Sequence, residues 1–216
     1  MSSAIAKLSG ISLGIGSAIM VYKAYFFPDL LKLEQVDSFL ATVNNVSILL
    51  LFGIIFLFLG FIGIYARIAS KAGAWGLIGF TFLFTYILLY EMTTYTLLSS
   101  VAPVVFDGVA SQGEFTKADS FMTSVFDHSV FRFFIFFIPL AFFGALGFAI
   151  GTLKSKVFPN WLAYLMLLAM ITPLLGFIPV QFLQAFFNSG IFYISLLCYG
   201  VVAAFQKDAA KDRNFI

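Results

Sequence analysis

The chain has 216 residues, of which 62% are hydrophobic and 10% are charged, and its mean hydropathy is +1.04. Soluble domains carry about 25% charged residues, so this composition excludes a water-soluble globule, a disordered chain and a nucleic-acid-binding protein. The formal charge of +2 gives no reason to expect a polyanionic partner. The single cysteine, Cys198, excludes a disulfide framework and a cysteine-based metal site. What remains is a multi-pass membrane protein.

The uncharged stretches of the chain predict the number of membrane crossings. A spanning helix needs ~20 apolar residues, because ~30 Å of hydrocarbon is crossed at ~1.5 Å per residue. Residues 157–206 carry no charge and would form a helix of ~75 Å, so they must turn back once, at the polar, proline-bearing segment 179–188. We therefore predict an all-α, polytopic transmembrane six-helix bundle that forms a single domain over residues 1–216. The predicted spans are 6–27, 45–66, 72–100, 129–153, 161–179 and 187–206.

The basic residues predict which way the bundle faces. With six spans, both termini and the second and fourth loops lie on one side, and this side carries eight of the twelve basic residues. They are Lys7, Arg67, Lys71, Lys154, Lys156, Lys207, Lys211 and Arg213. The opposite side carries Lys23, Lys32, Lys117 and Arg132. Because cytoplasmic loops are enriched in Lys and Arg, we expect both termini in the cytoplasm.

The longest predicted loop, residues 107–128, then lies outside. Phe115, Ala118, Met122 and Phe126 recur there at three- and four-residue steps with polar residues between them. This spacing predicts a short amphipathic helix on the outer face, just before the fourth span. It fits either a packed lid over the bundle or a binding surface.

Glu91 is the one carboxylate inside an apolar run, and an ionisable residue within a span is a functional candidate. Trp75 predicts the inner interface, and Glu91 lies 16 residues further on, or ~24 Å along a helix, in the outer leaflet. Thr94 and Tyr95 follow one turn later. Lys23 and Arg132 have similar depths and can pair with Glu91. We expect either a polar patch that holds a lipid headgroup, an ion or a proton, or an ion pair or hydrogen-bond cluster that joins three helices.

His128 is the only histidine. It lies one helical turn before Arg132, at the predicted water boundary, where a surface position without a catalytic role is the simpler interpretation. One histidine cannot provide bis-histidine haem ligation, and a metal site would need carboxylates for every other ligand. We therefore expect no metal and no cofactor. A membrane enzyme that uses Glu91 and His128 as acid and base remains an alternative.

Four basic residues are predicted to form a ring at the cytoplasmic turns, beside Tyr65, Trp75 and Trp161. Such a ring can hold anionic headgroups at ~1 kcal/mol per charge, or it can simply anchor the orientation of the protein. The ring consists of Arg67, Lys71, Lys154 and Lys156.

Two glycine pairs, Gly10/Gly14 and Gly147/Gly151, have the four-residue spacing that lets helix backbones approach closely. The chain also has 30 phenylalanines, which fit lipid-facing surfaces or a groove for acyl chains. Pro139 and Pro173 predict kinks in the fourth and fifth spans. Kinked neighbours can leave such a groove between them.

Two turns resemble a recurrent bacterial pattern. Residues 60–80, GFIGIYARIASKAGAWGLIGF, are similar to G-L-Y-A-R-x-A-x-x-x-G-x-x-G-L-x-G-F. Residues 148–161, FAIGTLKSKVFPNW, are similar to G-x-A-x-L-R-x-G-x-x-P-R-W, with Lys154 and Asn160 where arginines are usual. Both patterns are found in the DUF4386-type family of small multi-pass bacterial membrane proteins. The resemblance implies a multi-pass protein of the bacterial inner membrane and no particular activity.

These observations leave three functional hypotheses. The first is a non-catalytic accessory or structural subunit of a membrane assembly. The second is a binder or transporter of a lipid-like hydrophobic molecule, and the third is the enzyme based on Glu91 and His128. The expected partners are the lipid bilayer and other membrane-protein subunits, and no nucleic acid.

Overall fold

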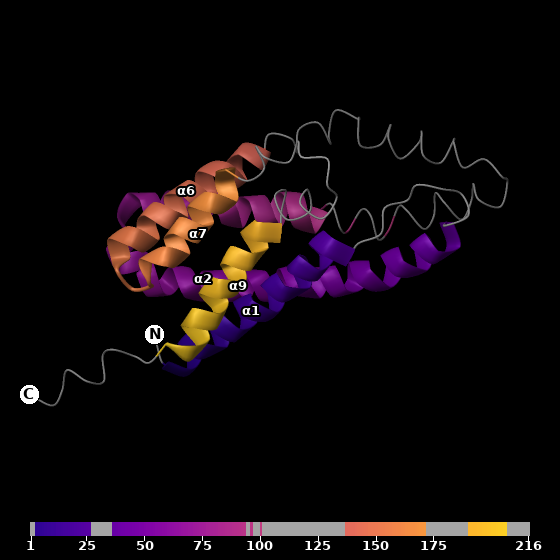
Figure 1. Ribbon diagram of the computed structural model, residues 1–216, viewed down its shortest axis with the longest axis horizontal. Coiled ribbons are helices and arrows are strands. Elements are labelled where there is room, and N and C mark those ends of the chain that lie inside the picture. Colours follow the sequence, from indigo (N-terminus) through magenta and orange to yellow (C-terminus); the bar gives the residue numbers. More distant parts are fainter. Residues whose placement is uncertain are drawn as a thin grey trace, which may run out of the picture.

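The computed structural model describes residues 3–26, 36–93, 96, 100, 137–171 and 190–206, and all regular structure in these ranges is helical (Figure 1). The prediction of an all-α protein is confirmed for this part of the chain. The helices are α1 (Ser3–Phe26), α2 (Val36–Tyr86), the π-helical turn η2 (Ile87–Glu91), α6 (Phe137–Ser155), α7 (Asn160–Ile171) and α9 (Ile191–Phe205).

The long helix α2 folds back on itself at Gly73. This residue has φ 65° and ψ −165°, a left-handed conformation that costs side-chain-bearing residues energy and that glycine adopts freely. The rings of Tyr65 and Phe80 stack with centroids 4.2 Å apart, and those of Phe58 and Phe84 lie 4.9 Å apart. In both contacts one residue precedes Gly73 and the other follows it, and the more distant partners in sequence still lie side by side. The helix therefore consists of two antiparallel arms, residues 36–72 and 74–86.

The helices close into a bundle around an apolar core. α1 packs on α2 and α9, α6 packs on α2 and α7, and α7 packs on α9. α1 runs antiparallel to the first arm of α2, since Gly63 lies against Ser9 and Gly53 against Ile19. α6 runs antiparallel to the second arm, since Gly79 lies against Gly147 and Gly76 against Gly151. The largest fully buried side chains include Leu13, Met20, Leu50, Leu57, Phe61, Phe148, Tyr193 and Tyr199.

Glycines bring three pairs of the described helical segments into backbone contact, namely α1 with the first arm of α2, α1 with α9, and the second arm of α2 with α6. The four-residue spacing of glycines predicts the last two. A Cβ atom added at Gly79 would lie 2.0 Å from the nitrogen of Phe148, and one at Gly10 would lie 2.5 Å from the nitrogen of Ala204. Gly14 differs, because a Cβ atom there would meet nothing within 4 Å. The backbone of Gly14 lies against Gly200 of α9. A side chain at position 14 would nevertheless point into open space.

Two stretches of the described residues are long and apolar enough to cross a membrane. They are Ala4–Tyr25 and Val46–Glu91, and the second includes both arms of α2. The apolar helices Pro139–Ser155, Asn160–Met170 and Ile191–Phe205 are shorter. Helical structure lies within each of the six predicted ranges, but six full-length spans are not shown.

Two details differ from the sequence prediction. The second helical segment includes residues 36–44, which precede the predicted span 45–66. The second helical segment also continues through residues 67–71, where a turn was predicted, and turns at Gly73. Pro139 lies near the beginning of the described part of α6, so the kink predicted there stays a prediction. Pro173 and the predicted outer-face helix within 107–128 lie outside the described residues.

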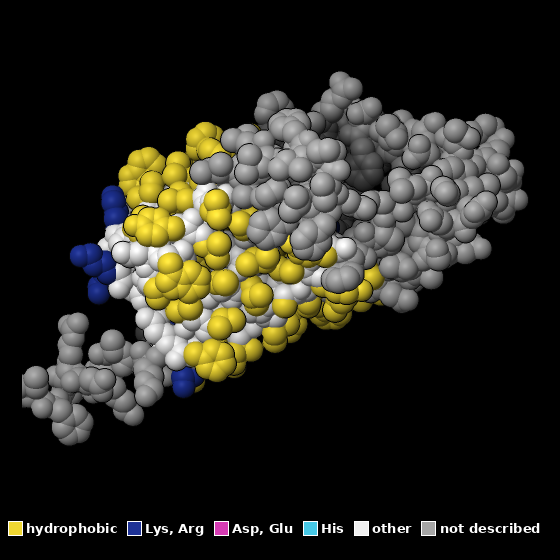
Figure 2. Space-filling model, in the orientation of Figure 1, with side chains coloured by type: hydrophobic (Ala, Val, Ile, Leu, Met, Phe, Trp, Pro, Cys, Tyr) yellow, Lys and Arg dark blue, Asp and Glu magenta, His cyan; other side chains and the backbone are white. Residues whose placement is uncertain are grey.

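The outward faces of the helices are apolar. On α1, Ile5, Leu8, Ile11 and Ile15 are exposed, although the opposite side of the same helix packs into the core. The first arm of α2 exposes a similar row, Phe52, Ile55, Phe56, Leu59 and Ile62. Figure 2 shows hydrophobic side chains over this face of the described part, with Lys and Arg gathered at the left end.

Candidate functional site

Glu91 is buried, with 5% of its surface exposed, at the last position of the π-helical turn. Its carboxylate atom Oε1 accepts a hydrogen bond from the hydroxyl of Tyr86 at 3.0 Å and another from Tyr193 at 2.5 Å. Tyr193 belongs to α9 and is 1% exposed. The Glu91 cluster, defined here as Glu91, Tyr86 and Tyr193, therefore joins the second arm of α2 to α9.

The π-helical turn explains how Glu91 and Tyr86 meet. Residues five apart point about 140° away from each other in an α-helix of 3.6 residues per turn. In η2 the backbone N–H of Met92 bonds to the carbonyl of Ile87, which adds one residue to the turn. Ile87 and Glu91 are four residues apart and are both buried, and the wider turn brings Tyr86 within reach of the carboxylate.

Aromatic rings surround this polar group. The rings of Tyr86 and Tyr90 stack with centroids 5.2 Å apart at 14°, and Phe192 meets Tyr193 edge to face at 5.2 Å. The tyrosine rings thus contribute apolar packing, while their hydroxyls provide the hydrogen bonds that a buried carboxylate needs.

The structure brings together only part of the predicted site. Glu91 lies at the end of the bundle far from Gly73, and Lys23, near the end of α1, lies at the same end because α1 is antiparallel to the first arm. Within the described ranges Glu91 forms no ion pair with Lys23. Thr94, Tyr95, His128 and Arg132 lie outside the described residues. Tyr86 and Tyr193 were not predicted.

A second set of polar contacts lies at the opposite end of the bundle, around Arg67. The guanidinium donates a hydrogen bond to the carbonyl of Ala203 near the end of α9 at 3.0 Å, and it lies 5.6 Å from the ring centre of Phe158. Cations near a helix C-terminus are favourable, and the ring adds a cation–π contact. Arg67 therefore ties α2 to α9 and to the turn between α6 and α7.

Two neutral contacts reinforce this end. The hydroxyl of Tyr199 donates to Oγ1 of Thr152 at 3.1 Å, which joins α9 to α6. The side-chain amide of Gln206 donates to the carbonyl of Val157 at 2.9 Å. The polar side chains at this end thus connect helices that are distant in the sequence.

The predicted basic ring has members of two kinds. Lys71, Lys154 and Lys156 are exposed, whereas Arg67 is half-buried and engaged by α9. Trp75 and Trp161 lie at the same end and are 49% and 48% exposed. The three lysines are free to meet a charged partner outside the bundle, and Arg67 has a structural contact of its own.

Two open apolar grooves flank α1. One, of about 280 Å³, lies between α1 and α9, and the other, of about 510 Å³, lies between α1 and the first arm of α2. In the second groove the hydroxyl of Ser12 donates to the carbonyl of Phe56 at 2.8 Å, and that of Ser9 donates to the carbonyl of Ala6 at 2.9 Å, so both serine hydroxyls in its lining are satisfied. Ile11 and Ile15 form the ridge that both grooves share.

No family model, curated protein or solved structure matches the chain. The resemblance to the DUF4386-type family therefore stays a prediction. Within the described ranges, no group of three or more His, Cys, Asp and Glu residues is arranged to hold a metal ion.

Proposed function

We propose that the chain is an integral membrane protein with six spans and with both termini on the cytoplasmic side of a bacterial inner membrane. The outward faces of α1 and α2 support the membrane setting, because a helix in water buries one apolar stripe and exposes polar residues on the other side. Lys7, Arg67, Lys71, Lys154 and Lys156 gather at one end of the bundle. This clustering supports a cytoplasmic assignment for that end.

We further propose that the protein is a non-catalytic packing subunit of a larger membrane assembly. The observation that supports this proposal is that polar side chains within the bundle form hydrogen bonds between helices. The Glu91 cluster, the Tyr199–Thr152 pair and the Arg67–Ala203 contact each connect separate helices. Hydrogen bonds between helices are a source of rigidity within a bilayer, and a rigid body with an apolar exterior is suited to packing against other spans.

Purification from the native membrane tests the packing role. The chain should be extracted in mild detergent, purified by an added tag, and its companions identified by mass spectrometry after chemical crosslinking. We expect one or a few membrane proteins in fixed stoichiometry, and the same companions from a Glu91→Gln variant that retains the fold. A lone chain that crosslinks to no membrane protein would contradict the proposal.

The two grooves beside α1 favour a second candidate function, the binding of a lipid-like molecule. Both grooves are lined almost entirely by apolar side chains and open toward the surface of α1, where hydrocarbon would lie in the proposed arrangement. The enzyme hypothesis requires His128 close to Glu91, and His128 lies outside the described residues, so no observation favours it.

A further inference from the structure

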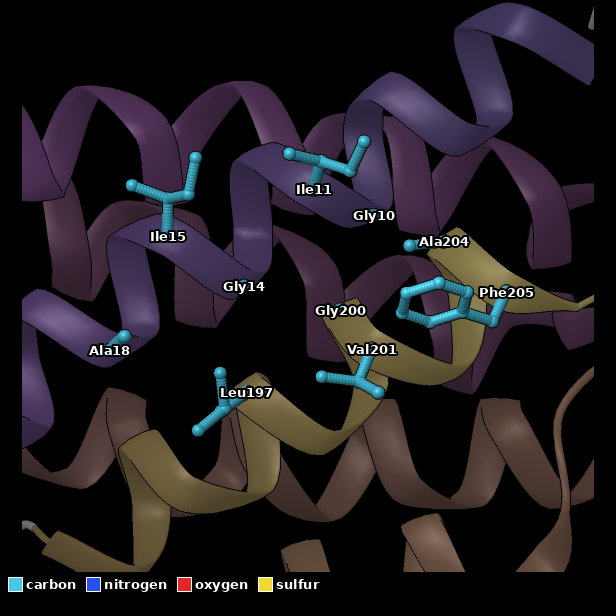
Figure 3. Close-up of a pocket in the computed structure, with 10 residues that line it drawn as sticks. All are labelled: Gly10, Ile11, Gly14, Ile15, Ala18, Leu197, Gly200, Val201, Ala204 and Phe205. Atoms are coloured by element: carbon cyan, nitrogen blue, oxygen red, sulfur yellow. The ribbon is translucent and has the colours of Figure 1, made fainter.

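The groove between α1 and α9 has a floor without side chains (Figure 3). Gly10 and Gly200 are pressed against the facing backbones, whereas a Cβ atom at Gly14 would meet nothing within 4 Å. Ile11 and Ile15 form one wall, and the other wall comes from α9 through Leu197 and Val201. The absence of a side chain at Gly14 therefore leaves the groove open.

The groove is short and narrow, dimensions that suit a single hydrocarbon chain. Its lining on α1 runs from Gly10 to Ala18, ~12 Å along the helix axis. Its volume is about 280 Å³. The backbones of α1 and α9 touch beneath it, so the groove is also narrow.

In the proposed arrangement the groove lies within one leaflet of the bilayer. Lys7 is exposed and lies three and four residues before Gly10 and Ile11, on the same side of α1. From Lys7 to the far end of the groove at Ala18 the helix rises ~16 Å, about half of the 30 Å hydrocarbon thickness. The groove therefore extends from a cationic end to the middle of the bilayer in the proposed arrangement.

We propose that the groove between α1 and α9 binds one acyl chain of an anionic phospholipid, with Lys7 at the phosphate headgroup. This inference rests on the proposed membrane setting and specifies a ligand class for the second candidate function. The charge complementarity comes from Lys7 and from the other basic residues at the same end (Figure 2). Each Lys or Arg near the surface strengthens binding to anionic lipid.

The test compares lipid retention by the full-length chain and its variants. Each protein is purified in detergent, supplied with phosphatidylglycerol or phosphatidylcholine, and examined by native mass spectrometry. We expect the wild type to retain one phosphatidylglycerol in preference to phosphatidylcholine. Gly14→Leu should abolish this retention, because its side chain enters the groove from a Cβ position that meets nothing within 4 Å. Lys7→Gln should weaken the preference about fivefold, the effect of one charge.

Two further variants act as controls. Ala74→Leu adds the same side chain at an exposed position outside the groove and should retain lipid as the wild type does. Ala18→Leu fills the far end of the groove and replaces Gly14→Leu if that variant fails to fold. Equal retention by wild type and groove-filling variants overturns the proposal, as does an equal loss in Ala74→Leu. A dimer that forms in the wild type and is lost in Gly14→Leu also overturns it, in favour of a docked helix.

The result can be separated from a failure of the membrane assignment. A chain that fractionates with membranes yet retains no phosphatidylglycerol contradicts the lipid site alone. A chain found in the soluble fraction contradicts the proposed function itself.

Discussion

Glu91 accepts two hydrogen bonds at one carboxylate oxygen, from tyrosines that lie in different helical elements. A carboxylate inside an apolar bundle is costly unless donors compensate for the water it has lost. Phenol hydroxyls are suitable donors here, because they bring an apolar ring into the same space. At the scale of single residues, this cluster is the clearest link between the second arm of α2 and α9.

The Glu91 cluster predicts a measurable coupling between its members. Tyr193→Phe removes one of the two hydrogen bonds that the buried Glu91 accepts, and we expect it to lower the free energy of unfolding in detergent by about 1–3 kcal/mol. Combined with Glu91→Gln in a double-mutant cycle, the two effects should fall well short of additivity. Tyr164→Phe, at an exposed position of α7, is the matched control and should change stability by less than about 0.5 kcal/mol. Strictly additive effects would show that the cluster does not join the helices.

Ser17 presents the opposite case, a buried hydroxyl without a partner. The Oγ atom of Ser17 has no hydrogen-bond partner and the residue is fully buried. Because an unsatisfied buried polar group costs about 1–3 kcal/mol, Ser17→Ala should raise the thermal unfolding temperature. Differential scanning fluorimetry in detergent measures the change, with Ser195→Ala as the comparison, since the Ser195 hydroxyl donates to the carbonyl of Phe192. A clear loss of stability in Ser17→Ala would contradict the assignment.

The sequence identifies Glu91 but not its partners, and the reason is local geometry. Positions three and four residues away are the neighbours on an α-helix, so the sequence indicated Thr94 and Tyr95. Tyr86 becomes a neighbour only through the π-helical turn, which leaves no recognised signature in the sequence. Tyr193 comes from α9, 102 residues away, and no spacing rule connects the two. The charged residue itself was conspicuous because its surroundings are apolar.

At the scale of helical elements, glycines set the distances between neighbours. The four-residue spacings of Gly10/Gly14 and Gly147/Gly151 predicted close backbone approach, and the contacts with α9 and with the second arm of α2 confirm it. A turn between the second and third predicted spans was expected at residues 67–71, whereas the chain turns at Gly73. The helical structure of residues 36–44 was not expected, because the predicted span was limited to the uncharged apolar run.

Two glycine substitutions of the same kind should have opposite effects. Gly79→Ala would place a Cβ atom 2.0 Å from the backbone of α6, and we expect a loss of at least about 2 kcal/mol in stability. Gly14→Ala meets nothing within 4 Å and should stabilise its helix by about 0.5–1 kcal/mol. Thermal unfolding of the two variants side by side measures both. An equal loss in both would mean that backbone contact does not distinguish these positions.

At the scale of the whole molecule, the arrangement of charge agrees with the arrangement of helices. The start of α1, the turn at Gly73, the turn between α6 and α7 and the end of α9 all lie at one end of the described bundle. The depths assigned in the membrane to the two grooves beside α1 and to Glu91 are measured from this end of the bundle. The account therefore depends on this basic end facing the cytoplasm as a unit.

Cysteine labelling in intact cells tests that claim most directly. In a Cys198→Ala background, single cysteines replace Ala4, Phe205 and Ser111 in turn, and a membrane-impermeant maleimide is applied before and after lysis. The account predicts that Ser111→Cys reacts in intact cells, whereas Ala4→Cys and Phe205→Cys react only once the cells are opened. Labelling of Ala4→Cys and Phe205→Cys from opposite faces of the membrane would contradict it.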